Sequence, residues 1–295
     1  MKDVKYEDII SFDALMNSAD QCRVGVMWKA STQMFWQNQM NWCATLHEQL
    51  ENGTFKPYGF YEFDINERGK KRHIRAVKLQ ERVVQKSLVQ NGLRPLIDPR
   101  LICDNSASIK GKGTQFALNR LRQHLAQHYR KHGRKGGILV MDYSSYFDSI
   151  DHEILLDMLK KIIADDRVFA LTAMFINAFP GDKGLGLGSE VSQTSAIFYP
   201  NKIDHYIKER LHIKGYGRYM DDSYIIHQDI EYLKYCRKEV ERMAAELGLK
   251  LNLKATQIVK FSSGSFEYLK KRFCITSSGK ILMRLSRKNV TKHRR

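Results

Sequence analysis

Three aspartates in two short stretches could carry out metal-dependent chemistry. Asp221 and Asp222 stand together between two runs rich in Tyr and Ile, within residues 217–226, which is typical of two strands joined by a tight turn. Asp142 follows a run of apolar residues at 138–141, which predicts a buried strand. An aspartate pair alone is more often a solvated turn. The third aspartate, at the end of a strand, favours a functional site.

We expect a cation at these carboxylates. A carboxylate directly after a buried strand is costly unless it is paired or bound to a metal. Three carboxylates at one place would also repel one another without a cation. Hard divalent ions such as Mg²⁺ bind carboxylate oxygens and keep substrate phosphates as further ligands. The sequence therefore predicts two Mg²⁺ ions, with Mn²⁺ as a substitute, in a site for in-line phosphoryl transfer.

The order of the motifs between residues 55 and 280 resembles that of reverse transcriptases. The YMDD box at residues 219–222, and the aromatic Phe147 five residues after Asp142, carry this resemblance. It implies an α+β fold of the right-hand polymerase type, with fingers and with a palm whose antiparallel sheet is backed by helices. It also implies that Asp142, Asp221 and Asp222 are catalytic, with Tyr143 beside them at the metal ions.

A glycine-rich loop adds detail to the resemblance. Gly188, Ser192 and Gln193 are similar to the loop of small bacterial reverse transcriptases, especially those of diversity-generating retroelements. The chain departs from the family at Gly186, where proline is common. Glycine makes this loop softer than a proline-containing one.

The resemblance implies two further sets of site residues. The incoming nucleotide would be held by a basic hairpin over residues 61–75, by the glycine loop, by an aromatic beneath its sugar and by a lysine near its pyrophosphate: Lys70, Lys71, Arg72, Phe147, Gly188, Gln193 and Lys254. The template and primer would contact the basic loop at 105–114, the glycine loop, the YMDD box and a primer-grip-like hairpin at 266–273: Lys110, Lys112, Ser192, Tyr219, Met220, Tyr268, Leu269 and Lys270.

Several of these residues have structural alternatives. The hairpin cations could form a solvated basic turn, and Phe147 could belong to the core. Trp28, Phe35 and Trp36 are assigned to the core ahead of template-side packing.

Apolar periodicity predicts where the helices lie. They are expected within residues 1–55 and 79–89, from Gln115, over 151–163, from Ser195 to Leu211 and over 230–247. With the resemblance, this order predicts fingers at residues 1–135, a palm at 136–283 and the basic start of a thumb at 284–295. The thumb is therefore expected to be short or missing.

Composition indicates the class of partner. Lys and Arg outnumber Asp and Glu by 17 in 295 residues, which favours a polyanionic partner. Five scattered cysteines without a C-x-x-C pair argue against a zinc site and against a disulfide framework, and so for a reducing cytoplasm. We find no signal peptide or long apolar span in the sequence, and we expect no membrane partner.

The predicted function is RNA-directed DNA synthesis in a bacterial or phage retroelement. The expected partners are an RNA template, a DNA or RNA primer and deoxynucleoside triphosphates, with an accessory protein or structured RNA as a further candidate. Two alternatives stay open: a defence-type reverse transcriptase with template-independent or protein-primed synthesis, and a non-catalytic RNA-binding scaffold. The intact set of three aspartates argues against the scaffold.

Overall fold

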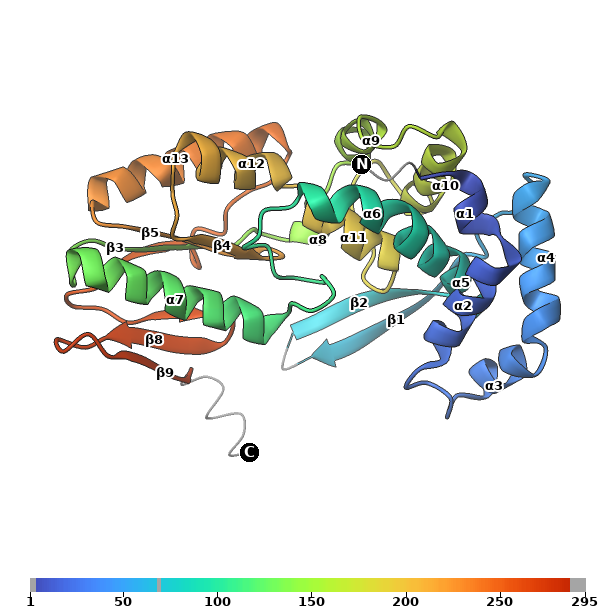
Figure 1. Cartoon of the computed structure of the whole chain (residues 1–295), viewed down its shortest axis with the longest axis horizontal. Helices are drawn as coiled ribbons and strands as arrows, with labels where there is room; N and C mark the ends of the chain where they lie inside the picture. Colours follow the sequence, from blue (N-terminus) through green and yellow to red (C-terminus); the bar gives the residue numbers. More distant parts are fainter. Residues whose placement is uncertain (1–3, 68–69, 287–295) are drawn as a thin grey trace. The chain divides into compact units, whose positions relative to one another are not determined.

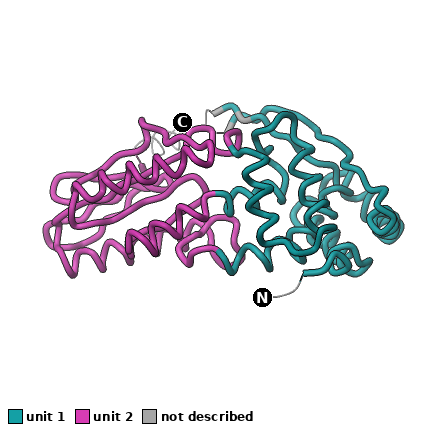
Figure 2. Tube along the Cα trace, turned by 90° about the horizontal axis from the view of Figure 1, so that it is seen from above, with its two compact units in different colours: residues 1–100, 150–199 teal, residues 101–149, 200–295 magenta. Residues whose placement is uncertain are grey.

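The chain forms two compact units, each built from two separate segments (Figure 2). The structure is a computed structural model that describes residues 4–67 and 70–286, without the side chains of Glu67, Lys70 and Arg72. Unit 1 comprises residues 1–100 and 150–199, and unit 2 comprises residues 101–149 and 200–295. Both units combine helices with antiparallel strands, which confirms the predicted α+β class.

Helices form the N-terminal part of unit 1, as predicted for residues 1–55. They are α1 (Tyr6–Ile10), α2 (Phe12–Arg23), α3 (Ala30–Gln37) and α4 (Gln39–Glu51). The hydroxyl of Ser11 accepts from the N–H of Ala14 and so caps α2. The assignment of three aromatic residues to the core is right for Phe35, but it is wrong for Trp28 and Trp36, whose exposed fractions are 76% and 48%.

The predicted hairpin lies next in unit 1. Strands β1 (Phe60–Glu67) and β2 (Lys70–Val77) pair in antiparallel register from Phe60 opposite Val77 to Glu67 opposite Lys70. Four helical segments follow: α5 (Leu79–Ser87), a π-helical turn (Leu88–Leu93), α6 (Arg94–Ile97) and a 3₁₀ turn (Asp98–Arg100).

The second segment of unit 1 contains α9 (His152–Lys160), α10 (Asp166–Asn177) and α11 (Glu190–Phe198). Each helix is capped by the side chain of the preceding residue: Asp151, Asp165 and Ser189. The helix expected from Ser195 to Leu211 therefore begins earlier, at Glu190. It also breaks near Pro200, and the chain continues as α12 (Asn201–His205) and a π-helical turn (Tyr206–Arg210).

A four-stranded antiparallel sheet is the centre of unit 2. Its strands are β3 (Gly137–Met141), β4 (Tyr216–Tyr219), β5 (Asp222–His227) and β6 (Gln257–Lys260), in the order β4-β5-β3-β6. Helix α7 (Thr114–His132) lies on one side of this sheet and α13 (Ile230–Glu246) on the other (Figure 1). A short helix, α8 (Tyr146–Ser149), follows β3.

A second sheet completes unit 2 with strands β7 (Phe266–Tyr268), β8 (Lys271–Ile275) and β9 (Ile281–Leu285). One apolar cluster joins both sheets to α7. It includes Leu121 and Leu125 from α7, Val140 from β3 and Phe273 from β8. This core fixes the strand ends that carry the candidate site.

The compact units are interleaved along the chain, whereas the sequence predicts consecutive fingers, palm and thumb. The bounds of those functional domains stay a prediction. Of the expected thumb, residues 287–295 lie outside the described part of the chain. Among the described residues, we find no helix that is long and apolar enough to cross a membrane.

Candidate active site

The register of β3 and β5 brings two of the three aspartates together. Met141 pairs with Ser223 at the end of the ladder, so Asp142 and Asp222 follow as the next opposite positions. Side chains two residues apart share one face of a sheet. Asp142 therefore lies on the same face of the sheet as Val140, and Asp222 lies on the same face as Tyr224. Val140 and Tyr224 pair directly with each other.

The third aspartate lies in the tight turn between β4 and β5. Tyr219 pairs with Asp222, so Met220 and Asp221 are the two residues of the turn, one residue earlier than the predicted aspartate pair. Met220 has a φ of 57°, in the left-handed region that residues other than glycine rarely adopt. Asp221 and Asp222 are both half-buried. The backbone of unit 2 thus places three carboxylates at one end of one sheet.

Asn252 contacts the first aspartate and was not predicted. Its side-chain amide donates to Oδ2 of Asp142 at 3.0 Å. Its segment also pairs with the backbone beyond β3, because Leu251 forms a β-bridge with Tyr143. In the sequence, Asn252 stands two residues before Lys254, and the prediction for this segment concerns only the lysine.

The donor set fits a hard divalent ion, because carboxylate oxygens are the ligands that Mg²⁺ and Mn²⁺ share. In the described part of the chain, no three side chains of His, Cys, Asp or Glu lie in an arrangement that could hold a metal ion. The register, rather than the side-chain positions, is therefore the observation that supports metal binding here.

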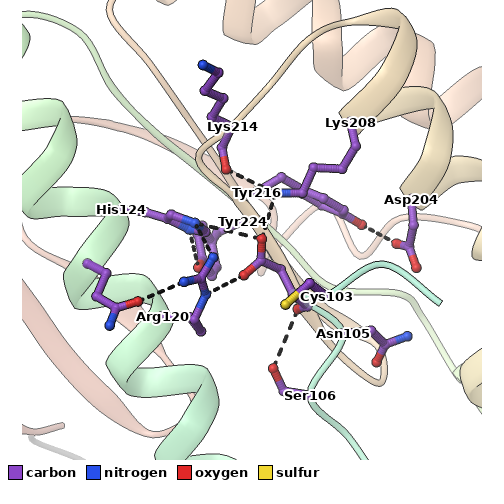
Figure 3. Close-up of polar contacts among 12 residues, drawn as sticks. Cys103, Asn105, Ser106, Arg120, His124, Asp204, Lys208, Lys214, Tyr216 and Tyr224 are labelled. Atoms are coloured by element: carbon purple, nitrogen blue, oxygen red, sulfur yellow. Dashed lines mark hydrogen bonds and ion pairs between the residues drawn. The ribbon is translucent and has the colours of Figure 1, made fainter. Parts of the chain in front are cut away.

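The strand that leads into the turn is fixed on its outer edge. The N–H of Arg218 donates to the carbonyl oxygen of Asp104 at 3.1 Å, and the N–H of Ser106 donates to the carbonyl oxygen of Arg218 at 3.0 Å. The carboxylate of Asp104 accepts from Arg120 at 2.6 Å and from Lys208 at 2.8 Å. Figure 3 shows Arg120, His124 and Lys208 around these contacts. Although burial raises it, these bonds hold the pKa of Asp104 below its ordinary value.

Three aromatic side chains follow Asp142. The rings of Tyr143 and Tyr146 stack at 5.5 Å and are buried, and burial raises the pKa of both phenols. Phe147 packs edge-on against Tyr146 at 5.7 Å but stays half-buried. Because the ring of Tyr143 is buried, the backbone carbonyl is the group that this residue could offer to a metal ion. Tyr146 fills the core, which leaves Phe147 for contact with a ligand.

The sequence matches the family described as "Reverse transcriptase (RNA-dependent DNA polymerase)" over residues 63–273. The chain belongs to the reverse transcriptase family. The matched range contains all three aspartates and Asn252. Enzymes of this family are RNA-directed DNA polymerases, which are nucleotidyltransferases.

Solved telomerase structures share the fold of this chain. Telomerase from Candida albicans in complex with a TWJ fragment of telomeric RNA superposes with a TM-score of 0.57 at 11% identity, covering 77% of this chain and 46% of that chain. Apo telomerase from Candida tropicalis gives 0.55 at 12% identity, covering 76% and 47%. The same enzyme truncated from its C-terminal domain gives 0.59 at 12%, covering 76% and 55%.

The chain thus spans about half the length of those telomerase chains. At such low identity the likeness shows the fold alone. No curated protein sequence matches the chain significantly.

In unit 1, the glycine loop lies against β2. The N–H of Arg75 donates to the carbonyl oxygen of Leu187 at 3.3 Å. Gly188 has a φ of 118°, and a Cβ there would lie 3.0 Å from the carbonyl oxygen of Arg75. A Cβ on Gly186 would lie 2.4 Å from the ring of Phe179. This packing explains why glycine stands where the family commonly has proline.

The two other predicted residues of this loop differ in exposure. Gln193 is exposed in the first turn of α11, so it is available to a nucleotide. Ser192 is buried, and its N–H donates to the capping hydroxyl of Ser189. Ser192 therefore belongs to the N-terminal cap of α11, in place of its predicted contact with nucleic acid.

The hairpin cations are described in part. The ammonium of Lys71 is exposed and pairs with the carboxylate of Asp64 at 2.8 Å. The backbones of Lys70 and Arg72 belong to β2, and their side chains lie outside the described part. Lys71 thus has an internal partner that a triphosphate would have to displace.

The residues predicted to contact template or primer also divide by burial. Tyr268 is 2% exposed and packs edge-on against Tyr224 at 5.1 Å, so its predicted contact is corrected to a core role. Leu269 and Lys270 form the turn after it, and both have positive φ, as a two-residue hairpin turn of type I′ requires. Lys270 is exposed there.

The basic loop of unit 2 contains two different lysines. Lys110 is exposed. Lys112 donates to the carbonyl oxygens of Cys103 at 2.7 Å and Asn105 at 3.1 Å, so it ties the loop to its own backbone.

Lys254 is exposed two residues beyond Asn252. Tyr219, in the YMDD box, is half-buried and accepts a bond from Thr114 at 3.3 Å.

Proposed function

We propose that this chain is a reverse transcriptase that adds deoxynucleotides to the 3′-hydroxyl of a DNA or RNA primer on an RNA template. The observation that carries the proposal is the β3–β5 register, which sets Asp142 opposite Asp222 at the sheet end where Asp221 lies in the turn. The membership of the family supports the same reaction.

The carboxylates of Asp142, Asp221 and Asp222, with the backbone carbonyl of Tyr143, would hold two Mg²⁺ ions. When bound, these ions supply the positive charge that favours attack of the 3′-hydroxyl on the α-phosphate and that offsets charge on the pyrophosphate. Asn252 would orient Asp142 by donating to its Oδ2.

Other side chains would hold the nucleotide. Phe147 lies beneath the sugar, Gln193 and the backbone at Gly188 approach the base pair, and Lys254 acts near the pyrophosphate. The cations of the hairpin (Lys70, Lys71 and Arg72) bind the triphosphate, for which the fork of arginine is well suited.

The template and primer would lie along exposed and half-buried residues of unit 2. Met220 and Tyr219 contact the primer end, Leu269 and Lys270 act as the primer grip, and Lys110 contacts backbone phosphate. Such phosphate contacts position a nucleic acid without reading its sequence. An accessory protein or a structured RNA would act as a further partner.

We place the functional domains at residues 1–135 (fingers), 136–283 (palm) and 284–295 (start of a thumb). We also assign the enzyme to a cytoplasmic retroelement of bacterial or phage origin. The exposed Gln193 and the glycine loop, which are similar to those of small bacterial enzymes, support this assignment.

The test is single-nucleotide extension of a DNA primer on an RNA template with Mg²⁺. Asp142→Asn, Asp221→Asn and Asp222→Asn should each abolish most incorporation without a change in melting temperature, because an amide does not supply the charge that holds two cations. Asp157→Asn, which changes an exposed aspartate on α9, is the control and should keep wild-type activity. Near-normal extension by the Asp221 variant would contradict the proposal.

One alternative is template-independent or protein-primed synthesis of the defence type. Omitting the RNA template distinguishes the two activities. A templated enzyme incorporates the nucleotide that complements the template and stops without it, whereas a template-independent enzyme continues.

A further inference from the structure

A buried ion pair lies directly beneath the catalytic turn. The side chains of Arg218 and Asp204 are 1% and 0% exposed. The Arg218 guanidinium donates from Nε to Oδ1 of Asp204 at 2.9 Å and from Nη2 to Oδ2 at 2.6 Å. Tyr216 adds a further bond, because its hydroxyl donates to Oδ1 of Asp204 at 2.5 Å. The carboxylate comes from α12 and the two donors from β4.

The remaining arm of the guanidinium reaches the turn itself. Nη1 of Arg218 donates to the carbonyl oxygen of Met220 at 2.9 Å. That carbonyl belongs to the peptide group between Met220 and Asp221. Because a peptide group is planar, fixing its oxygen fixes the plane from which the Asp221 backbone continues.

Stability alone is a weak reason for this arrangement. Removing two charges from water costs about as much as their attraction returns, so a buried pair is often no more stabilising than apolar residues of the same volume. The turn, in contrast, contains a costly feature. A left-handed residue other than glycine persists only where its surroundings hold it, and Met220 has a φ of 57°.

We propose that Arg218, locked by Asp204, is a positioning residue that fixes the Met220 carbonyl and so sets where Asp221 and Asp222 present their carboxylates to the metal ions. This inference rests on the proposed function. Arg218 touches no reacting atom in this arrangement and acts through the backbone of the turn.

The strand does not depend on the arginine side chain for its place. The backbone of Arg218 is held by Asp104 and Ser106 on one side and pairs with Ser223 of β5 on the other. A change of this side chain should therefore alter the turn while β4 stays in the sheet.

Arg218→Lys is the main test because it keeps the charge and removes the fork. A lysine is a point charge that cannot hold Asp204 at two oxygens and also reach the Met220 carbonyl. We expect kcat to fall on the order of tenfold to a hundredfold, since a displacement of about 1 Å can cost about 10²-fold. The KM for template–primer should stay within about twofold, because that surface is unchanged.

A second readout does not depend on turnover. Binding of Mn²⁺ to the full-length protein, measured by electron paramagnetic resonance, should weaken on the order of tenfold in Arg218→Lys, since the carboxylates are no longer held in place. Arg237→Lys is the matched control. It removes a guanidinium bond to a carboxylate in the same unit, that of Glu241 on α13, and no bond to β4 or to the turn. Its Mn²⁺ affinity should equal that of the wild type.

The outcomes separate this inference from the proposed function. A wild-type protein that does not extend a primer overturns the function, while Mn²⁺ affinity still reports on the turn. Wild-type kcat and Mn²⁺ affinity in a folded Arg218→Lys variant would overturn the positioning role. Should that variant fail to fold, Tyr216→Phe loosens Asp204 without removing a charge. A weaker Mn²⁺ affinity in Tyr216→Phe supports the role, and an unchanged one overturns it.

Discussion

The side-chain amide of Asn252 and the backbone N–H of the same residue both hold Asp142. The amide donates to Oδ2 at 3.0 Å and the N–H donates to the carbonyl oxygen at 2.8 Å. One residue thus fixes both the side chain and the main chain of the aspartate that ends β3. The neighbouring bond from the N–H of Ser144 to the carbonyl oxygen of Lys250, at 2.8 Å, continues this pairing.

We predict that Asn252→Ala lowers incorporation about 10- to 100-fold, as is typical when a residue that orients a metal ligand is lost. Asn252→Asp should be worse, because a second carboxylate beside Asp142 repels it and raises its pKa. Leu253→Ala, at a neighbouring exposed side chain, is the control. The measurement is primer extension over a range of Mg²⁺ concentrations. Equal activity in the Ala and Asp variants would argue against an orienting role.

Phe147→Val should raise the use of ribonucleotides relative to deoxynucleotides, by about tenfold or more, because it opens space for a 2′-hydroxyl. Tyr146, and not Phe147, fills the core at this point, so the variant should keep its melting temperature. The measurement is the ratio of kcat/KM for a ribo- and a deoxynucleoside triphosphate. An unchanged ratio with a clear fall in melting temperature would return Phe147 to a core role.

Lys110 and Lys112 should differ in what their loss changes. If Lys110 contacts one phosphate of the duplex, Lys110→Ala should reduce the slope of log K against log salt concentration by about 0.9. Lys112→Ala should instead lower the melting temperature, since its ammonium holds two backbone carbonyls. Binding of an RNA–DNA hybrid between about 50 and 200 mM salt measures the slope. The reverse pattern would show that the two roles are exchanged.

His124 should make the fold sensitive to acid. Burial lowers its pKa to about 4, with Lys208 and Arg120 acting in the same direction and Asp104 opposing them. The hydroxyl of Tyr224 lies 2.9 Å from its Nδ1. The unfolded chain binds a proton near the ordinary pKa of about 6.5, and the folded chain does not. The contribution of His124 to the free energy of unfolding is therefore complete above the ordinary pKa of about 6.5. It is lost as the pH falls toward 4, by up to about 1.4 kcal/mol per pH unit.

His124→Gln should remove that part of the pH dependence, which urea unfolding at several pH values would measure. Burial also lowers the pKa of His128, so a smaller dependence should persist. His212→Asn, at an exposed histidine, is the control and should keep the wild-type profile. A wild-type profile in His124→Gln would contradict the prediction.

The sequence predicted the elements whose signal is local. The apolar run before Asp142 and the basic hairpin each have a short pattern, and β3 and the β1–β2 hairpin lie where those patterns predict. The β4–β5 turn lies one residue earlier than the aspartate pair predicts, because Asp222 already pairs with Tyr219. The burial of single residues was harder to predict from the sequence. Trp28 is exposed and Tyr268 is buried because the partners that decide their burial are distant in sequence.

The contacts that hold the site depend on long-range folding. Asp204 lies 14 residues before Arg218, and only the return of the chain from α12 into β4 brings them together. Asn252 lies 110 residues from Asp142. Such pairs leave no periodic or motif signal in one sequence. The sequence shows that Gly186 departs from the proline common in the family. The reason for this departure, the nearby ring of Phe179, is visible only in the fold.

The interleaving of the compact units has a consequence for synthesis of the protein. The chain passes between the units at residues 100/101, 149/150 and 199/200, so neither unit is one continuous piece. A ribosome that has released residues 1–149 has delivered part of each unit and all of neither. Unit 1 becomes complete only when residue 199 emerges, and the carboxylates of unit 2 meet only later still. Only a cut at the middle passage, 149/150, leaves neither unit whole in either fragment, whereas residues 1–199 contain all of unit 1 and residues 101–295 contain all of unit 2.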